Sequence, residues 1–529
     1  MSKQVLSFNM NLFSYALLLL SFLSTLYCDK ILVFLPLPIW SHHMQYERVW
    51  TALAERGHEV TLYSSFPPKA NLTNLKHVNI RLPKFEIRMK GFNPAELTSS
   101  VNEILGSLFL WDFGFEGTTE TYGTAEFKSL MSSKKHFDLV VTESFFASES
   151  LLALGHRFKA PNIVICSFGV AMNSLDSFGS PNLPSFMPDF RTQYSDQMSF
   201  FQRFRNFNVF FITRIMEYIY YYPKVQGLID EHFGKDYPSL YSMMSNVSLS
   251  FLYTNPSMAP VAPLVPNMVR VGGIHLKKPG KLPTDLQKRA DAAKNGFIYM
   301  SFGSVVDPAK LNEKIKFKLL NFLKEIKVPV FWKIDLTNDP VIKPETLPGN
   351  VFIQKWYPQA DILDHPNLRL FITHGGISSL MEATFLGVPV MGIPFFGDQY
   401  SNLMLLKNRG YALVEPIQTL SQESLLQQTQ LMLNDPGFRN NAKKWSLIFN
   451  DELSAPLDRA VYWTEHVLRH KGAPHLSSYS RHLSWYQMYS VDVILTMLAL
   501  VYAVVKLLTM CCCRAGSSKK SADLAKKKN

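Results

Sequence analysis

The sequence contains very little cysteine. Five cysteines occur in 529 residues, three of them consecutive at 511–513, and Cys166 is the only one between Cys28 and the last long apolar run. A body with a single cysteine cannot form an internal disulfide, so it depends on its hydrophobic core for stability. Asp-x-Asp and His-Glu-x-x-His motifs are also missing. Because such motifs commonly hold metal ions, we expect no metal and no other cofactor.

Charged residues are scarce as well, at 18 % of the chain against 47 % hydrophobic residues. This balance excludes a disordered chain, and the length favours two domains. The formal net charge is +12, but the tail from Arg514 onward has six Lys or Arg and one Asp, a net charge of +5. Since a basic tail beside an apolar run orients a membrane protein, the surplus indicates membrane topology and no nucleic-acid partner.

Two long apolar runs flank the body. The first has the length of a secretory signal peptide, which we place at 1–28; an uncleaved anchor is the alternative. The second predicts a transmembrane helix at 491–510, followed by a cytosolic tail at 511–529. The body between the two runs is then lumenal, in a single-pass type I membrane protein.

Short motifs fit the secretory pathway. The ending KKKN, at 526–529, resembles the dilysine retrieval signal of endoplasmic reticulum membrane proteins, or it is only a basic stop-transfer tail. Asn71 and Asn246 begin sequons and are the expected glycosylation sites. We therefore expect the endoplasmic reticulum membrane as the location.

Apolar runs alternate with helical patterns through the body. In 29–255, for example, the apolar run 30–37 precedes a helical pattern at 46–57. A stretch with six prolines, 256–286, is interpreted as the interdomain linker, and the alternation then restarts and extends over 287–488. This pattern predicts two parallel sheets of the Rossmann-like α/β class. Ligands of such sheets bind at the carboxyl ends of the strands, here in a cleft between the domains.

The segment from Trp356 to Asn402 is the richest in candidate site residues. His374 and two glycines form a turn between an apolar strand and a helix, so backbone N–H groups and the helix N-terminus offer an anion site suited to phosphate. Glu382, farther along the helix, suits a ribose diol. Trp356 offers a flat face to a base. Asp398 and Gln399 follow the next strand and are expected to bind sugar hydroxyls.

The spacing of these residues resembles the signature of the UDP-glycosyltransferases, in their membrane-bound animal branch. The resemblance implies a GT-B fold, in which two Rossmann-like domains face each other across a cleft, plus a C-terminal transmembrane helix. It also implies binding roles: uracil on Trp356, the nucleoside on Gln359, pyrophosphate on His374, ribose on Glu382, and the transferred sugar on Asp398 and Gln399. The other residues that it assigns to the UDP-sugar are Ser301, Gly303, Ser304, Gly376 and Ser378.

Two positions depart from the family pattern. Lys333 stands where many relatives have Arg, and a lysine supplies charge but no bidentate fork. Ser378 stands where common vertebrate members have Asn. Both departures leave the donor sugar open, and neither bears on UDP binding.

Ser41-His42 follows the first strand, where the resemblance implies a Ser-His pair whose histidine is the general base. Imidazole suits this role because it titrates near neutrality. We choose His42 over His43, which is expected to be structural or to line the acceptor pocket. A carboxylate should hold the tautomer of the base, and Glu143 takes this role where relatives often have Asp. Asp138 begins that strand and is a poor substitute.

The preferred interpretation is an inverting transferase that moves glucose from UDP-glucose to a hydroxyl of a small lipophilic acceptor, as in detoxification. A glucuronosyltransferase on the same scaffold is one alternative, and a non-catalytic UDP-sugar or lipophile-binding partner of another transferase is the other. The aromatic segment 201–223 predicts an acceptor pocket lining, a bilayer contact or a core helix. The acceptor and the oligomeric state stay open.

Overall fold

The computed structural model describes residues 28–91, 103–169, 172–192, 194–304, 306, 310–337, 339 and 341–526. The predicted signal peptide, apart from Cys28, and the last three residues of the KKKN ending lie outside the described residues. The chain divides into two compact units, of which the first ends at Ser477 and the second begins at Ser478.

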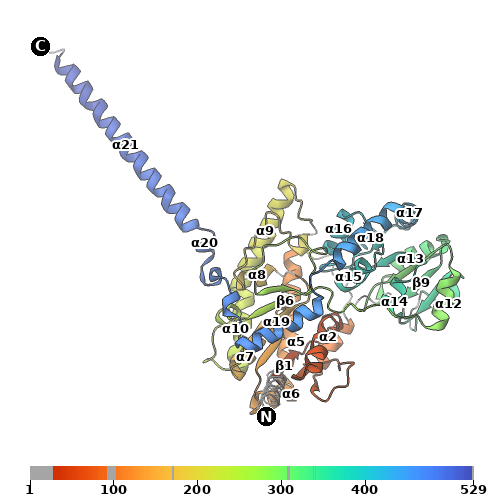
Figure 1. Cartoon of the computed structure of the whole chain (residues 1–529). Helices are drawn as coiled ribbons and strands as arrows, with labels where there is room; N and C mark the ends of the chain where they lie inside the picture. Colours follow the sequence, from red (N-terminus) through yellow and green to blue (C-terminus); the bar gives the residue numbers. More distant parts are fainter. Residues whose placement is uncertain are drawn as a thin grey trace, which may run out of the picture. The chain divides into compact units, whose positions relative to one another are not determined.

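The first domain is built on a parallel sheet of seven strands (Figure 1). Its central strands are apolar runs: every side chain of β1 after Lys30 is buried, as is every side chain of β4. Burial on both faces is typical of a parallel sheet that is covered by helices. In spatial order the strands are β3 Leu75–Asn79, β2 Glu59–Ser64, β1 Lys30–Leu35, β4 Leu139–Glu143, β5 Asn162–Cys166, β6 Leu249–Leu252 and β7 Met268–Arg270.

The second domain repeats this architecture with a parallel sheet of six strands. Its central strands β8 and β11 are again buried along nearly their whole length. The strands, in spatial order, are β10 Val351–Gln354, β9 Val330–Lys333, β8 Phe297–Ser301, β11 Leu368–Thr373, β12 Val390–Gly392 and β13 Ala412–Val414.

Helices connect the strands and pack on the sheets (Figure 1). Those between β1 and β7 are α2 Trp40–Glu55, α3 Pro83–Gly91, α5 Glu103–Gly123, α6 Ala125–Ser132, α7 Ala153–Phe158, α8 Met172–Ser177, α9 Phe200–Met216, α10 Tyr222–His232 and α11 Leu240–Ser245. Those after β7 are α12 Thr284–Ala292, α13 Glu313–Glu325, α14 Gln359–Leu363, α15 Ile377–Phe385, α16 Gln399–Asn408, α17 Gln422–Asn434, α18 Pro436–Asn450 and α19 Pro456–His470.

Strand β7 corrects the predicted linker 256–286. It pairs with β6 as the seventh strand of the first sheet, so this sheet extends well into the proline-rich stretch. A strand of only three residues, Met268–Arg270, carries too little pattern to stand out in this proline-rich stretch.

The last helix of the first unit, α19, returns to the first domain, where it packs on α2 (Figure 1). Arg56, directly after α2, donates to Glu465 of α19 through Nε and Nη2, at 2.5 and 3.0 Å. Arg459 of α19 also donates to the backbone oxygen of Arg270, at 2.9 Å. The chain therefore crosses twice between the domains.

The second unit contains α20 Trp485–Met488 and the long helix α21 Val491–Lys526. The part Val491–Cys511 of α21 is long and apolar enough to cross a membrane. This helix fits the predicted anchor at 491–510.

Candidate active site

Each sheet reverses its strand order at one point, between β1 and β4 in the first sheet and between β8 and β11 in the second. At such a point the loops leave in opposite directions and open a crevice outside the carboxyl ends of the strands. His42 follows β1 and Glu143 ends β4. Ser301 ends β8 and His374 follows β11. The predicted site residues thus lie at both switch points.

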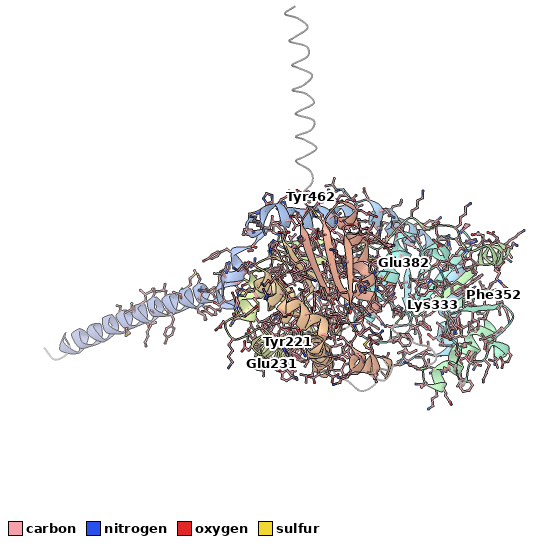
Figure 2. The ribbon with its side chains drawn as sticks, turned by 90° about the horizontal axis from the view of Figure 1, so that it is seen from below. Tyr221, Glu231, Lys333, Phe352, Glu382 and Tyr462 are labelled. Atoms are coloured by element: carbon pink, nitrogen blue, oxygen red, sulfur yellow. The ribbon has the colours of Figure 1, made fainter. Side chains whose placement is uncertain are left out.

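One cavity of about 1450 Å³ runs along these crevices. Figure 2 shows Glu382 on the side of the second domain that faces the first sheet, and Phe352 on the opposite side. The predicted site residues that line the cavity are His42, Gly303, Ser304, Trp356, Gln359, His374, Gly376, Ser378, Glu382, Asp398 and Gln399. Glu143 and Ser301 do not line the cavity: Glu143 contacts His42, and Ser301 is buried.

His42 lies inside a helix that begins before the predicted helical pattern at 46–57. Helix α2 begins at Trp40, six residues before the predicted start, and Ile39 at its N-cap makes no side-chain hydrogen bond. Because no capping side chain marks this start, the sequence carried no local signal for it. His42 is thereby held in the first turn of a long helix.

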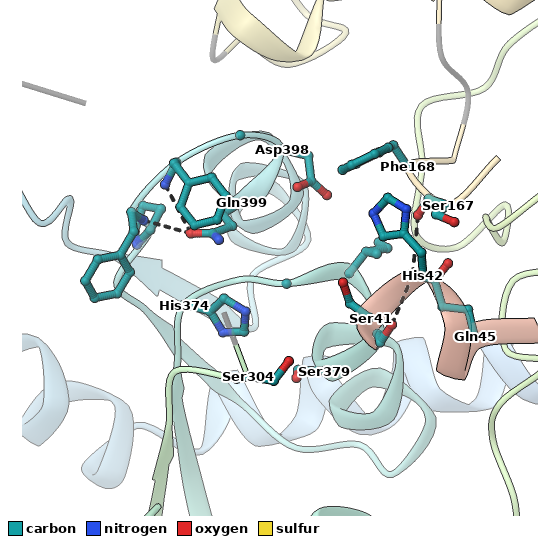
Figure 3. A pocket seen from close by; sticks show the side chains of 18 of the residues that line it. Ser41, His42, Gln45, Ser167, Phe168, Ser304, His374, Ser379, Asp398 and Gln399 are labelled. Atoms are coloured by element: carbon teal, nitrogen blue, oxygen red, sulfur yellow. Dashed lines mark hydrogen bonds between the residues drawn. The ribbon is translucent and has the colours of Figure 1, made fainter. Parts of the chain in front are cut away.

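The His42 Nδ1 atom lies 2.7 Å from Glu143 Oε1, and both side chains are buried. The same carboxylate oxygen accepts a hydrogen bond of 2.8 Å from Ser167 Oγ, just beyond β5. Since the carboxylate accepts from Nδ1, the other ring nitrogen, Nε2, is left to accept a proton. Figure 3 shows the His42 ring between Ser167 and Asp398 at the cavity wall.

His43 is structural. Its ring is 3 % exposed and packs beside Trp40 and Phe66, at centroid distances of 6.3 and 5.5 Å. Burial lowers the pKa of His43 to about 4, so the imidazole is neutral at physiological pH. It does not line the large cavity, which favours His42 as the reactive member of the pair.

The glycines around His374 make room for its ring. Gly303 has φ +76°, and a Cβ atom there would lie 2.6 Å from His374 Cε1. A Cβ atom at Gly376 would lie 2.5 Å from His374 Nε2. Any side chain at either position would displace the imidazole from the N-terminus of α15, where a diphosphate is expected.

Burial, together with the nearby Lys333 ammonium, lowers the pKa of His374 to about 3. His374 therefore faces the cavity as a neutral donor, and Lys333 supplies the positive charge. Lys333 Nζ donates to the Gly303 backbone oxygen at 2.8 Å and lies 4.8 Å from the centre of the Trp356 ring. Trp356 is 64 % exposed, so its other face is open to a base.

Gln359 and Glu382 form one polar unit. Gln359 Nε2 donates to Glu382 Oε2 at 2.6 Å and to Ser379 Oγ at 3.0 Å. Burial raises the pKa of Glu382 to about 7, although the bond from Gln359 opposes this shift. Glu382 is thus about half protonated near neutrality. Because a carboxylate accepts hydrogen bonds from both hydroxyls of a diol, strong diol binding requires the ionised form.

Asp398 and Gln399 are held by local bonds. Asn402 Nδ2 donates to Asp398 Oδ2 at 2.6 Å. Gln399 Oε1 accepts from the backbone N–H groups of Phe395 and Phe396, at 2.8 and 3.2 Å, so its NH₂ group is what remains for a ligand. Burial raises the pKa of Asp398, while His42 across the cavity lowers it.

The sequence analysis did not include Tyr253 and Gln45, which form a polar contact between the domains at the predicted residue Ser378. Ser378 Oγ accepts from Tyr253 Oη at 3.2 Å and from Gln45 Nε2 at 3.4 Å. Tyr253 also bonds His275, whose Nε2 lies 3.9 Å from a Glu382 oxygen. Ser378 therefore joins the donor-side helix α15 to the first domain, a role that its position in the sequence alone could not reveal.

The remaining predicted residues lie outside the cavity. Asn71 and Asn246 are exposed on the surface of the first domain, as glycan acceptors must be. No group of three or more His, Cys, Asp or Glu side chains that could hold a metal ion occurs in the described part of the chain. The expected absence of a metal cofactor stays a prediction.

The sequence matches the family described as "UDP-glucoronosyl and UDP-glucosyl transferase" over residues 29–528. UDP-glycosyltransferase UGT5 and UDP-glucosyltransferase 2 of Dactylopius coccus are each 32 % identical to this chain; the alignments cover 93 and 94 % of it and 93 and 96 % of the relatives. Human UDP-glucuronosyltransferase 2B7 is 31 % identical, over 92 % of this chain and 93 % of its own.

Solved structures with the same architecture include the calicheamicin glycosyltransferase CalG4, with a TM-score of 0.58 and 17 % identity, over 84 % of this chain and 99 % of that chain. A UDP-glucose: anthocyanidin 3-O-glucosyltransferase in complex with UDP has a TM-score of 0.54 at 16 % identity, over 84 and 99 %. At this identity the likeness concerns the fold alone, and the predicted GT-B fold is confirmed.

Proposed function

Since the chain belongs to the family of UDP-glucuronosyl and UDP-glucosyl transferases, we propose that it transfers glucose from UDP-glucose to a hydroxyl group of a small lipophilic acceptor, with inversion at the anomeric carbon. The observation that carries this proposal is the buried pair of His42 and Glu143, 2.7 Å apart, on the wall of the cavity that also holds the donor-side turn at His374.

In the proposed reaction His42 Nε2 takes the proton of the acceptor hydroxyl. Glu143 holds Nδ1–H and stabilises the imidazolium that forms. Ser167 donates to the same carboxylate and keeps it in place. The acceptor oxygen forms a bond to the anomeric carbon while the bond from that carbon to the UDP oxygen breaks, and the proton later leaves His42 for solvent.

UDP departs with additional negative charge, which must be stabilised. The N-terminus of α15, the neutral His374 donor and the Lys333 cation all lie at this end of the cavity. We propose that these three groups stabilise the charge on the departing UDP without a metal ion. EDTA is then expected to leave the initial rate unchanged, and a rate restored only by Mg²⁺ or Mn²⁺ would contradict this part of the proposal.

The charges around the transferred sugar favour glucose over glucuronic acid. Asp398 is half-buried, and burial of its carboxyl raises its pKa, while the hydrogen bond from Asn402 and the nearby His42 oppose that shift. A glucuronate carboxylate next to an ionised Asp398 would lie beside a like charge, which disfavours its binding there. Human UDP-glucuronosyltransferase 2B7 is nevertheless a relative at similar identity, so glucuronosyl transfer is kept as the second candidate.

The acceptor side of the cavity supports a lipophilic acceptor. Beyond His42 its wall is formed by aromatic side chains, including Phe109, Phe113, Phe146 and Phe168. The Phe168 ring lies edge-on to His42, with centroids 4.8 Å apart. Apolar walls around one base suit a flat or hydrophobic molecule with a single reacting hydroxyl. Conjugation of such compounds for detoxification is the role that we propose.

We also propose that the body is lumenal in the endoplasmic reticulum. Support comes from the apolar run at 12–27, the anchor helix α21 and the exposed sequons at Asn71 and Asn246. Treatment with an N-glycosidase should increase the electrophoretic mobility of the protein from cell membranes, and Asn71→Gln with Asn246→Gln should remove that shift. A protein whose mobility the enzyme does not alter would contradict lumenal exposure of these sites.

The test of the function is UDP release by membranes that carry the protein. UDP-glucose or UDP-glucuronic acid is offered with a panel of phenolic acceptors, beside His42→Ala and the matched control His43→Gln. Acceptor-dependent release from UDP-glucose that is lost only in His42→Ala is expected. Release from UDP-glucuronic acid alone would favour the second candidate. If neither donor gives UDP release while UDP still binds, the result would favour a non-catalytic binding partner of another transferase.

A further inference from the structure

Helix α9 and the π-helical turn Glu217–Tyr221 that continues it present an unusually apolar outer face. Phe201 is 80 % exposed and Ile219 is 72 % exposed. We call the set of exposed large apolar residues on this segment the aromatic stripe; it consists of Phe200, Phe201, Phe204, Phe207, Phe211, Ile212, Ile215, Tyr218 and Ile219. The positions recur every three or four residues, so they share one side of the helix.

The remaining exposed side chains of this segment are Arg203 and Arg205, and none is acidic. A helix that faces water would carry mixed polar residues at such positions. A stripe of aromatic and aliphatic side chains next to arginines matches instead the boundary between lipid headgroups and acyl chains, where arginine meets phosphate and aromatic rings are enriched.

The orientation of α9 is fixed by its buried face. Asn206 is fully buried; its Oδ1 accepts from the Asp189 N–H at 2.8 Å, and its Nδ2 donates to the backbone oxygens of Pro184 and Met187 at 2.7 and 3.0 Å. A capping box between Ser199 and Gln202 fixes the first turn. Rotating the stripe inward would break these bonds and bury the arginines, so the outward direction is built into the fold.

The rest of the chain indicates which partner covers the stripe. The candidate membrane helix begins at Val491, and thirteen residues separate it from Ser477, the end of the first unit. Even a fully extended segment of that length reaches only about 45 Å. Whenever α21 crosses a bilayer, the body is therefore confined close to that bilayer, and its lipid surface is within reach of the aromatic stripe.

We propose that the aromatic stripe of α9 rests in the surface of the bilayer that anchors the chain. Figure 1 shows α9 at the edge of the first domain. Contact there orients the body on the membrane, since a single anchor helix would leave it free to tumble.

The stripe also bears on how the acceptor enters, a consequence that rests on the proposed function. Gln202 and Arg205 of α9 line the same cavity as His42. One helix thus has one side on the lipid surface and another on the cavity wall. A lipophilic acceptor dissolved in the bilayer can then move along α9 to the cavity without crossing bulk water.

The direct test places spin labels on the full-length chain in phosphatidylcholine vesicles with and without phosphatidylserine. The background has Ser in place of Cys28, Cys511, Cys512 and Cys513, and keeps the buried Cys166. Labels are attached at Phe204→Cys and Phe211→Cys. The matched control is Leu447→Cys, an apolar residue of α18 that is 74 % exposed.

Both stripe labels are expected to collide with lipid-dissolved oxygen more than with a water-soluble nickel complex, and the Leu447→Cys label to show the reverse. Stripe labels that behave like the control would overturn the proposal. Labels shielded from both reagents would also overturn it, because they would indicate contact with a second copy of the chain. This measurement needs no enzymatic activity, so it is independent of the proposed function.

The consequence for acceptor entry is tested by kinetics. The double variant Phe201→Ser with Phe204→Ser is expected to raise the KM of a membrane-partitioned phenol about tenfold, because entry from the bilayer is lost. The KM of UDP-glucose and of a water-soluble phenol should not change. Equal changes for both phenols, or none for either, would contradict entry along α9, while loss of all activity would point to the fold or to the proposed function.

Discussion

Replacing Glu143 by Gln tests the proposed base most directly. The amide has nearly the same shape, so the Ser167 contact and the packing can be retained, but the negative charge 2.7 Å from His42 Nδ1 is lost. In the proposed reaction the base starts as a neutral imidazole, and that form is little affected by the loss. The imidazolium that forms when His42 takes the acceptor proton loses its counter-charge, so the effect falls on the transition state.

The size of the effect follows from the geometry. Two unit charges 2.7 Å apart, at an effective dielectric constant of about 20, attract each other by roughly 6 kcal/mol. Breaking a buried pair by removing one partner costs about 3–5 kcal/mol in measured cases. We therefore expect kcat to fall by roughly 10²- to 10⁴-fold. The KM of UDP-glucose should change little, because Glu143 does not line the donor end of the cavity.

The assay is the initial rate of acceptor-dependent UDP release, with UDP-glucose affinity measured in parallel. Glu149→Gln is the matched control. Glu149 is also buried in the first domain, but it accepts from Tyr221 Oη at 2.7 Å and does not contact His42. Its variant should keep the rate. A Glu143→Gln enzyme with a kcat within threefold of the parent would refute the reasoning, and His42 would then need another partner or another role.

Three further predictions concern the neighbours of this pair. Ser167→Ala should lower kcat about tenfold and leave the donor KM unchanged, since a hydrogen bond to a charged group contributes about 1.5–3 kcal/mol; an altered donor KM in initial-rate measurements would point to a different role. The affinity for UDP-glucose should strengthen as pH rises through about 7, where Glu382 loses its proton. Calorimetry should show this dependence vanish in Glu382→Gln, and a dependence that survives would assign it elsewhere. Gly303→Ala should weaken UDP-glucose binding about tenfold, because the added Cβ and the positive φ displace His374; unchanged affinity would show that the imidazole can shift freely.

The predicted donor-side residues lie close together in the structure for a physical reason. The turn at His374, the helix with Glu382 and the loop at Asp398 all belong to one continuous segment of strand, turn and helix, so local spacing places them at one edge of the second sheet. The start of α2 was missed because Ile39 provides no cap. Strand β7 was missed because a strand of three residues carries too little pattern.

The acceptor half of the site was harder to predict, because it depends on contacts between residues that are distant in the sequence. Ser167 reaches Glu143 across neighbouring strands, and Gln45 reaches Ser378 across the two domains, 333 positions away in the sequence. No periodicity encodes such contacts. Its place in the sequence could have indicated Ser167, because it stands directly after the carboxyl end of β5, the strand that pairs with β4 and Glu143.

The position of Ser378 changes what its departure from the family pattern means. Its place in the turn where the donor is expected left the choice of sugar open. The hydroxyl instead accepts from Tyr253 and Gln45 of the first domain, at 3.2 and 3.4 Å, and the larger Asn would meet both side chains. The immediate effect of this departure is on the contact between the two domains. We therefore expect the sugar preference to depend on Asp398 and its surroundings, where a half-buried carboxyl lines the cavity.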